Sequence, residues 1–306
     1  MFAIELQDVT KTFGEHVAVN GLSLAVPKGS VYGFIGPNGS GKTTTLRMMM
    51  NIILPDAGAI HVLGAPLTPS SCDRMGYMPE ERGLYKRMKV RELLVFFGGL
   101  KREENIKAKV EQWLERLDLG AWANKKVETL SKGMSQKVQF IATVVSEPEL
   151  VLLDEPFTGL DPVNTEVIKD AILELQKQGT TVIFSTHDMS MAEKMCDFIF
   201  MIFKGKKVLD GTLAAIQDQY ASDTIRVRTR NGAEVLQNIP GIERINDFGQ
   251  LQELRLTADG DPQKILQAIL SRTSIQSFDI VKPSLHDIFI RIAGPEAKEV
   301  NHAQNS

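Results

Sequence analysis

The stretch GPNGSGKT, residues 36–43, fits the pattern G-x-x-x-x-G-K-[ST] and sets the expectation for the rest of the fold. Glycines let such a loop curl until its backbone N–H groups converge on phosphate oxygens. Lys42 adds a cation for the β and γ phosphates, and the hydroxyl of Thr43 suits Mg²⁺. A helix beginning at the loop favours the anion further. A plain glycine-rich turn would not need a strand before it and a helix after it, so the stretch predicts phosphate binding.

The segments around this loop alternate between strands and helices. Residues 31–35 form a continuous apolar run, as a strand buried on both faces would, and buried strands are also expected at 150–153 and 181–185. Helices are expected from about Lys42 to Ile52 and over 163–177. This alternation predicts an α/β fold, with helices on the faces of a parallel sheet.

A helical subdomain is expected as an insertion over about residues 86–147. Within it, Val110, Trp113, Leu114 and Leu117 follow the i, i+3, i+4, i+7 spacing of one apolar helix face. A first domain over residues 1–220 would contain this insertion and every phosphate-binding feature.

Two acids follow the apolar run at 150–153. At such a strand end the first acid, Asp154, can hold Mg²⁺, usually through water, and the second, Glu155, can orient or deprotonate an attacking water. If the pair stood alone, a solvated Asp-Glu pair without a catalytic role would explain it equally well. The phosphate loop in the same chain favours the catalytic interpretation.

The segment LSKGMSQ, residues 130–136, precedes a long helix and offers a second anion site. Ser131 would present a hydroxyl there, and Gly133 would present bare backbone N–H groups. By itself the segment is better explained as a plain helix cap with Ser131 at the N-cap position.

Composition and charge exclude several classes of protein. The 306 residues include 35 Lys and Arg against 38 Asp and Glu, a net charge of −3, so no basic excess indicates nucleic-acid binding. Two distant cysteines exclude a disulfide scaffold and a cysteine-rich zinc module. The longest apolar run, residues 198–203, is far shorter than the roughly 20 residues that cross a bilayer. Acids near the start argue against a signal peptide, so a cytoplasmic chain is expected.

Five motifs together resemble one family, the ATP-binding subunits of ABC transporters, which are P-loop NTPases. They occur in the family's order, as Walker A at 36–43, the signature at 130–136, Walker B at 150–155, the D-loop at 158–161 and the switch histidine at 185–188. The resemblance covers residues 1 to about 215. It implies ATP and Mg²⁺ as ligands, ATP hydrolysis, and a dimer, from two identical or paired ATPase subunits, that closes around two ATP molecules.

The resemblance also implies roles for single residues. Glu155 would be the catalytic carboxylate, His187 would contact the γ-phosphate and sense its loss, and Asp161 would face the partner subunit. Phe13 would stack on adenine, with a core role as its alternative. The remaining contacts to the subunit's own ATP would come from the loop, namely Gly36, Pro37, Asn38, Gly39, Ser40, Gly41, Lys42, Thr43 and Thr44. The partner's ATP would be bound by Ser131, Lys132, Gly133 and Gln136.

The sequence departs from the family pattern at two places. Glu80 stands where the family usually has glutamine, in the loop that links the nucleotide site to the membrane partner. A carboxylate there can still bind Mg²⁺ directly or through water, so the expected metal set is Thr43, Asp154 and Glu80. In the signature, Lys132 replaces a glycine and Met134 a glutamine, while Ser131 and Gly133 remain.

The C-terminal part is expected to be a separate α+β domain over residues 221–293, followed by a disordered tail at 294–306. Its expected order of elements, strand 224–230, helix 233–238, strands 242–247 and 251–257, helix 262–271 and strand 275–281, is ferredoxin-like. A last helix should start at Ser284, with Asp287 completing its cap. The segments 79–85 and 282–289 resemble ATPases of the ABC-2 export type, including those of drug and sodium efflux.

The leading hypothesis is therefore an ATPase that drives a separate transmembrane permease, on the inner face of the cell membrane, with the permease docking near residues 77–85. A soluble ABC ATPase acting on nucleic acid or ribosomes is the alternative. Residues 222–292 contain nine Lys and Arg and nine Asp and Glu, so their net charge is zero and they offer no basic surface for the phosphates of a nucleic acid. This disfavours the alternative, and no nucleic-acid partner is expected. The C-terminal domain could instead be a small-molecule or ion sensor, although a dimer-stabilising or permease-contacting appendage is favoured.

Overall fold

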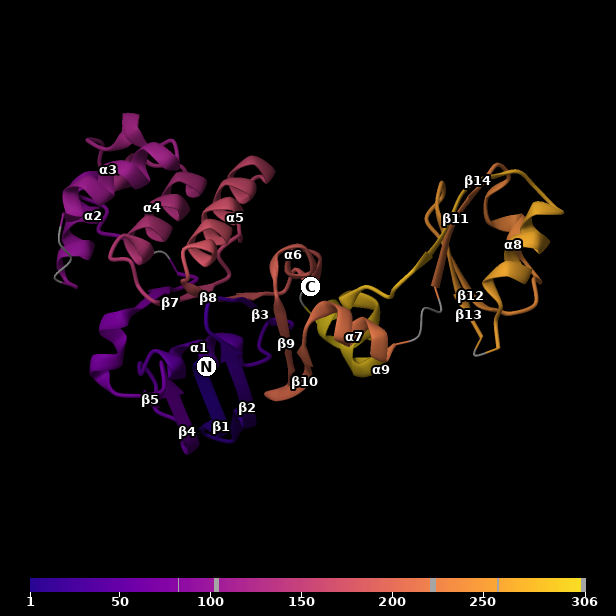
Figure 1. The fold of residues 1–306 in the computed structure, drawn as a ribbon, viewed down its shortest axis with the longest axis horizontal. Coiled ribbons are helices and arrows are strands. Elements are labelled where there is room, and N and C mark those ends of the chain that lie inside the picture. The colour runs from indigo at the N-terminus through magenta and orange to yellow at the C-terminus, as the bar shows by residue number, and fades with distance from the viewer. Residues whose placement is uncertain (82, 102–104, 221–223, 258, 304–306) are drawn as a thin grey trace. The chain divides into compact units, whose positions relative to one another are not determined.

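The computed structural model describes residues 1–81, 83–101, 105–220, 224–257 and 259–303. Two compact units make up the chain, Met1–Thr212 and Leu213–Ser306 (Figure 1). The boundary lies eight residues before the one expected from the sequence. The reason is helix α7 (Leu213–Gln219), which is tied to residues after the last strand: Gln217 Nε2 donates to the Pro283 carbonyl at 3.0 Å, and Lys282 pairs with Asp218.

The first unit contains two sheets. A six-stranded sheet has the order β10-β9-β3-β8-β7-β6, and all of its neighbouring pairs are parallel except β9 and β10. Its strands are β3 (Val31–Ile35), β6 (Met75–Met78), β7 (Leu150–Asp154), β8 (Thr181–Thr186), β9 (Phe198–Phe203) and β10 (Lys206–Gly211). Every residue of β3, β7 and β8 is buried, as expected for central strands covered on both faces.

A four-stranded antiparallel sheet, in the order β2-β1-β4-β5, lies on one side of the larger sheet. Its strands are β1 (Phe2–Phe13), β2 (His16–Pro27), β4 (Ala57–Val62) and β5 (Ala65–Pro66). One apolar core joins the two sheets and includes Leu46, Met48 and Met49 of helix α1 (Lys42–Met49). The antiparallel sheet therefore holds its β1–β2 hairpin beside the start of α1.

The second core of this unit covers the opposite face of the larger sheet and extends into the helical subdomain. The helices of the region are α2 (Val90–Gly99), α3 (Ile106–Arg116), α4 (Lys132–Val144), α5 (Pro162–Lys177) and α6 (Met189–Met195), with 3₁₀ turns at Pro69–Arg74, Gly120–Trp122 and Val127–Thr129. The apolar face expected on α3 is present, since Val110, Leu114 and Leu117 are buried and Trp113 packs edge-on against Phe140 of α4.

The second unit has the sheet order β12-β13-β11-β14 expected of a ferredoxin-like domain. Its elements are β11 (Thr224–Thr229), β12 (Ile242–Asp247), β13 (Gln252–Leu256), α8 (Pro262–Leu270), β14 (Ile275–Val281) and α9 (Leu285–Ala303). The helix expected at 233–238 is instead a 3₁₀ turn at Gly232–Leu236. A helix this short is marginal, and the single turn in the connection 230–241 still buries Leu236.

Helix α9 begins as expected, because Ser284 and Asp287 exchange capping hydrogen bonds: each backbone N–H is bonded to the other's side chain at 3.1 Å. The tail expected to be disordered from residue 294 is drawn as part of α9 as far as Ala303, and its disorder stays a prediction. The chain passes Gly294 in a non-helical conformation and resumes the helix at Pro295, a residue suited to a first turn. Residues 304–306 lie outside the described residues.

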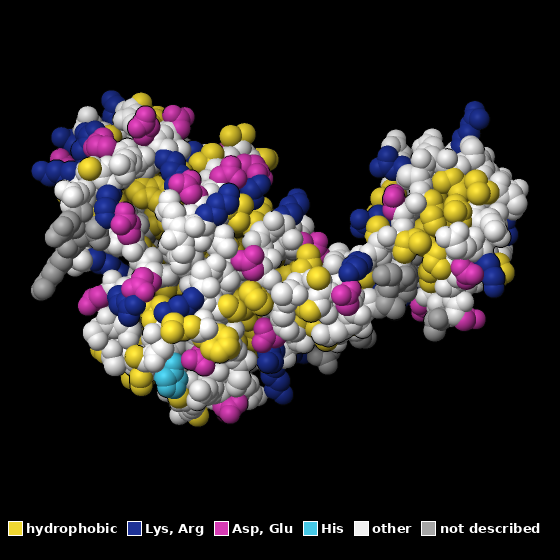
Figure 2. All heavy atoms as spheres, viewed as in Figure 1, with side chains coloured by type: hydrophobic (Ala, Val, Ile, Leu, Met, Phe, Trp, Pro, Cys, Tyr) yellow, Lys and Arg dark blue, Asp and Glu magenta, His cyan; other side chains and the backbone are white. Residues whose placement is uncertain are grey.

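No helix within the described residues is long and apolar enough to cross a membrane. Basic and acidic side chains are interspersed over the visible face of each unit (Figure 2).

Candidate functional site

The loop at 36–43 connects β3 to α1, and two of its glycines are required by the backbone. A Cβ atom at Gly36 would lie 2.2 Å from the carbonyl oxygen of Ile202. Gly41 has a φ of 107°, and a Cβ atom there would lie 2.5 Å from the carbonyl oxygen of Ala18. No other residue could replace either glycine without moving neighbouring backbone.

The first helical hydrogen bond of α1 joins the Thr45 N–H to the Gly41 carbonyl at 3.0 Å. Helix geometry therefore leaves the N–H groups of residues 42–44 without partners inside the helix. They carry the partial positive charge of the helix start and point toward the loop. This arrangement suits a phosphate group.

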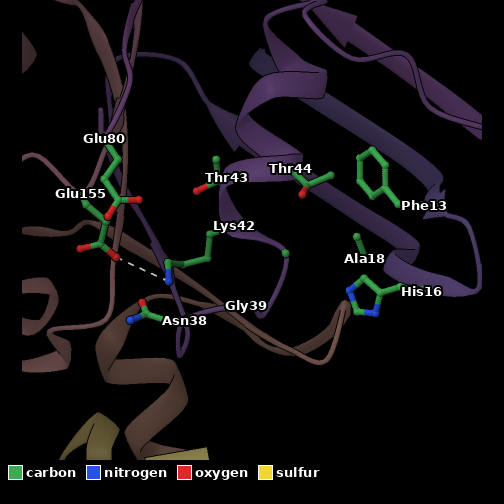
Figure 3. A pocket seen from close by; sticks show the side chains of 11 residues that line it. Phe13, His16, Ala18, Asn38, Gly39, Lys42, Thr43, Thr44, Glu80 and Glu155 are labelled. Atoms are coloured by element: carbon green, nitrogen blue, oxygen red, sulfur yellow. Dashed lines mark ion pairs between the residues drawn. The ribbon is translucent and has the colours of Figure 1, made fainter. Parts of the chain in front are cut away.

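The ammonium group of Lys42 is folded onto the loop that carries it. Its Nζ atom donates to the carbonyl oxygens of Gly36 at 2.7 Å and Pro37 at 3.2 Å, and it lies 3.5 Å from Oε1 of Glu155 (Figure 3, dashed line). Burial lowers the pKa of Lys42 below its ordinary value, and the Glu155 carboxylate opposes this change. The same cation is placed to exchange these oxygens for those of a phosphate.

A cavity of about 310 Å³ opens in front of the loop (Figure 3). Phe13, which is 48% exposed, stands at one side of it, and Lys42 and Glu155 stand at the other. The cavity is lined by Phe13, His16, Ala18, Asn38, Gly39, Gly41, Lys42, Thr43, Thr44, Glu80 and Glu155. The structure thus brings together an aromatic ring, the phosphate loop and the carboxylates of Glu80 and Glu155.

His16 and Ala18 also line this cavity, and the sequence analysis did not identify them. His16 is the cross-strand neighbour of Phe13 at the end of the β1–β2 hairpin. No local pattern marks either residue, because only the hairpin register places them beside the loop.

The end of β7 holds the two acids predicted there. Glu155 adopts a left-handed backbone conformation, with a φ of 50°. Its carboxylate lies 3.0–3.1 Å from Nδ1 of His187 and accepts a hydrogen bond from the Thr158 hydroxyl at 3.3 Å. In this conformation His187 contacts the carboxylate expected to activate water.

Asp154 is fully buried behind Glu155. Its Oδ1 atom accepts a hydrogen bond from the Ser185 hydroxyl at 2.6 Å, whereas its buried Oδ2 atom has no hydrogen-bond partner. A buried carboxylate oxygen without a partner is costly unless a ligand satisfies it. The sequence places Ser185 in the switch motif at 185–188 but does not predict its contact with Asp154, which is 31 residues away and meets it through strand pairing.

Glu80 lies at the cavity and is exposed. The backbone on both sides of it is held by Gln139 of α4, whose Nε2 atom donates to the carbonyls of Pro79 at 2.8 Å and Glu81 at 3.2 Å. Gln139 also was not identified from the sequence. It connects the helix that begins at the signature to the loop that carries Glu80.

The signature lies elsewhere on the unit: among the described residues, none from 130–136 lines this cavity. Ser131 is exposed and caps α4, with its Oγ atom accepting from the Met134 N–H at 3.2 Å, and Lys132 is exposed. A Cβ atom at Gly133 would lie 3.2 Å from Asn164 Nδ2, and the backbone N–H of Asn164 is bonded to Asp161 at 2.9 Å. The signature and the D-loop are therefore neighbours.

Gln136 differs from its expectation. It is buried, and its Nε2 atom donates to the carbonyl of Pro156 at 3.1 Å. A side chain held this way fastens α4 to the residue after Glu155 instead of reaching outward to a partner's nucleotide.

Comparison with known proteins gives matches along most of the chain. The ABC transporter family matches residues 19–158, and the C-terminal domain of DrrA1-3-like ATP-binding proteins matches residues 211–293. The chain is 40% identical over 293 residues to the uncharacterized ABC transporter ATP-binding protein YhaQ of Bacillus subtilis, covering 95% of this chain and 98% of that one. It is 33% identical over 305 residues to Nod factor export ATP-binding protein I of Rhizobium sp. strain N33, covering 97% and 99%.

Solved structures agree with these relatives. The ATP-binding subunit of an ABC transporter superposes with a TM-score of 0.67 at 27% identity, covering 71% of this chain and 93% of that one. A nucleotide-free ATP-binding cassette of an ABC transporter superposes with a TM-score of 0.63 at 25% identity, covering 69% and 92%. The predicted family and fold are thereby confirmed, and the chain belongs to the ATP-binding subunits of ABC transporters, ATPases whose hydrolysis of ATP is coupled to transport.

Proposed function

We propose that ATP binds in the cavity between Phe13 and Glu155, and that its hydrolysis drives export through a separate membrane permease. The observation that carries the proposal is the meeting of Lys42 and Glu155, 3.5 Å apart, at the phosphate end of a cavity whose other side is Phe13. Glu155 activates the attacking water, and Lys42 neutralises the β and γ phosphates. His187, which contacts Glu155 here, turns to the γ-phosphate when ATP is bound.

The residues at the β7 end fit Mg²⁺. The unpartnered Oδ2 atom of Asp154 is one oxygen for it, directly or through water, and Thr43 and Glu80 line the cavity in front of the phosphate loop. Mg²⁺ commonly combines one or two protein oxygens with substrate phosphates and water, and would there neutralise charge that develops on the phosphates.

A second ATPase subunit, identical or paired, would complete each site. The cavity is open, and the exposed signature residues Ser131 and Lys132 do not line it. Ser131 and Gly133 at the start of α4 form an anion-binding helix terminus for the ATP of the partner subunit. Asp161, beside this terminus, faces the same partner.

A second cavity, of about 460 Å³, supports docking of a permease segment. It lies between β6 and helices α2 and α4, and its lining is mostly apolar: Met50, Met75, Tyr77, Leu84, Phe97, Leu100 and Ala142, with nine others. Leu100 is 63% exposed at its rim. An apolar groove of this kind accepts a short helix, which would hold the chain at the membrane face. The export direction rests on relatives named Nod factor export ATP-binding protein.

The permease contact can be tested by a charge in the groove. We expect Leu100→Glu to abolish co-purification of a polytopic membrane protein with the tagged chain from its own cells, because an ionised carboxylate cannot be buried against an apolar helix. Leu54→Glu is the matched control, since Leu54 is 68% exposed and does not line the groove. Basal ATPase activity should be unchanged in both. Equal recovery of the membrane protein with wild type and Leu100→Glu would rule out this groove as the dock.

Glu80→Gln tests the loop between the two cavities. It should retain basal ATPase activity, because the amide oxygen can replace a carboxylate oxygen and Glu80 is not placed to activate water. Stimulation by the permease should change more, since Gln139 ties this loop to a helix that lines the groove. Steady-state ATPase assays with and without permease in nanodiscs measure both values, with Glu81→Gln as control. Complete loss of basal activity would instead assign Glu80 to the catalytic Mg²⁺ site.

A further inference from the structure

Ser185 lies at the end of β8, directly beside Asp154 in the parallel pairing of β7 and β8. Its side chain is fully buried, and it contacts both acids of the β7 end. The hydroxyl donates to Oδ1 of Asp154 at 2.6 Å, and the same Oγ atom accepts from the backbone N–H of Glu155 at 3.0 Å. The Ser185 hydroxyl therefore donates to the side chain of one acid and accepts from the backbone of the other.

The bond to Asp154 fixes the orientation of that carboxylate. Because Oδ1 is occupied by Ser185, Oδ2 is the oxygen left for a further ligand, and it is the one without a partner. Groups that orient a metal-binding carboxylate in this way act on metal affinity although they do not touch the metal.

The bond to Glu155 holds a backbone conformation that glutamate rarely adopts. With a φ of 50°, Glu155 is in the left-handed region, which persists only where surrounding contacts impose it. Ser185 supplies one such contact through the N–H group. His187, two residues further along the same segment, contacts the carboxylate. If His187 turns to the γ-phosphate, the Ser185 contact to Glu155 remains.

We infer that Ser185 is a positioning residue for hydrolysis: it aims Oδ2 of Asp154 at the divalent cation and keeps the Glu155 backbone in the conformation that presents its carboxylate to water. This inference rests on the roles proposed above for Asp154 and Glu155. It assigns Ser185 no contact with nucleotide, metal or water.

The test is Ser185→Ala, which removes both hydrogen bonds. We expect the affinity for Mn²⁺, the probe for the divalent site in the presence of ADP, to fall by about 10-fold, and kcat for ATP to fall by about 10–100-fold, the range typical of such supporting groups. Affinity for ADP in EDTA should be unchanged, because the phosphate loop is intact. Electron paramagnetic resonance of free Mn²⁺ gives the first value, and a coupled ATPase assay gives the second.

Two further variants exclude a general effect on folding. Ser30→Ala removes another buried serine of the same unit, whose Oγ atom donates to the Pro27 carbonyl at 2.7 Å, and should leave Mn²⁺ affinity and kcat unchanged. Ser185→Cys preserves the size of the side chain but is a weak donor, so it should fold and still lose Mn²⁺ affinity. Wild-type Mn²⁺ affinity and kcat in Ser185→Ala or Ser185→Cys would overturn the inference.

Asp154→Asn separates this outcome from failure of the proposed site. If Asp154→Asn loses Mn²⁺ binding while Ser185→Ala does not, only the inference about Ser185 is wrong. If Asp154→Asn binds Mn²⁺ as wild type does, the proposed metal site is wrong, and the inference about Ser185 is overturned with it.

Discussion

Glu155→Gln is expected to bind ATP, to hydrolyse it about 10²–10⁴-fold more slowly than wild type, and to accumulate as a dimer. The amide keeps the size of the side chain and can still accept the Thr158 hydrogen bond, but it cannot take a proton from water. Binding should survive, because the phosphate loop and Lys42 are unchanged. Size-exclusion chromatography in ATP, with and without Mg²⁺, measures the dimer, and phosphate release measures the rate.

The dimer gives this experiment a second, independent outcome. Adding Ser131→Arg to Glu155→Gln should restore the monomer, because a bulky side chain would occupy the place proposed for the partner's γ-phosphate. If the double variant dimerises as well as the single one, ATP is not shared between subunits. If Glu155→Gln turns over ATP at the wild-type rate, another group activates the water.

Lys42→Ala should reduce ATP turnover by at least about 10²-fold, the typical cost of removing one preorganised electrostatic contact to a transition state, and should weaken ATP binding. The substitution removes the ammonium group near the phosphate end of the cavity. It also leaves the carbonyls of Gly36 and Pro37 without their Nζ donor, so the loop loses an internal support. Fluorescent-nucleotide titration and an ATPase assay measure the two effects separately.

Lys28→Ala is the control, because Lys28 is exposed and does not line the cavity. It should match wild type in both assays. Turnover close to the wild-type rate in folded Lys42→Ala would contradict the assignment of the loop as the catalytic phosphate site.

Local sequence patterns predict the parts of the fold that depend on local chemistry. The segments 31–35 and 181–185 coincide with central strands, because strands covered on both faces are rich in apolar residues along their length. Sequence patterns fail to predict the type of helix where a short helical segment connects two strands. The 3₁₀ turn at Gly232–Leu236 is of this kind.

The candidate site likewise contains some features that the local sequence predicts and others that it does not. The loop at 36–43 is contiguous in sequence, so its glycines, lysine and threonine could be identified together. The contacts of His16, Gln139 and Ser185 with the site could not be predicted, because each arises between distant segments. Their residue types are ordinary for a hairpin, a helix and a buried strand, and only the assembled sheets show what they contact.

Because Glu155 has a left-handed backbone, stability and ATP turnover favour different residues at this position. A residue other than glycine in this region costs about 1–3 kcal/mol of conformational strain, which the rest of the fold must offset. Glycine would relieve the strain and remove the carboxylate. Selection for thermal stability alone would therefore favour an inactive chain at this position, and laboratory evolution of a more robust variant has to gain its stability elsewhere.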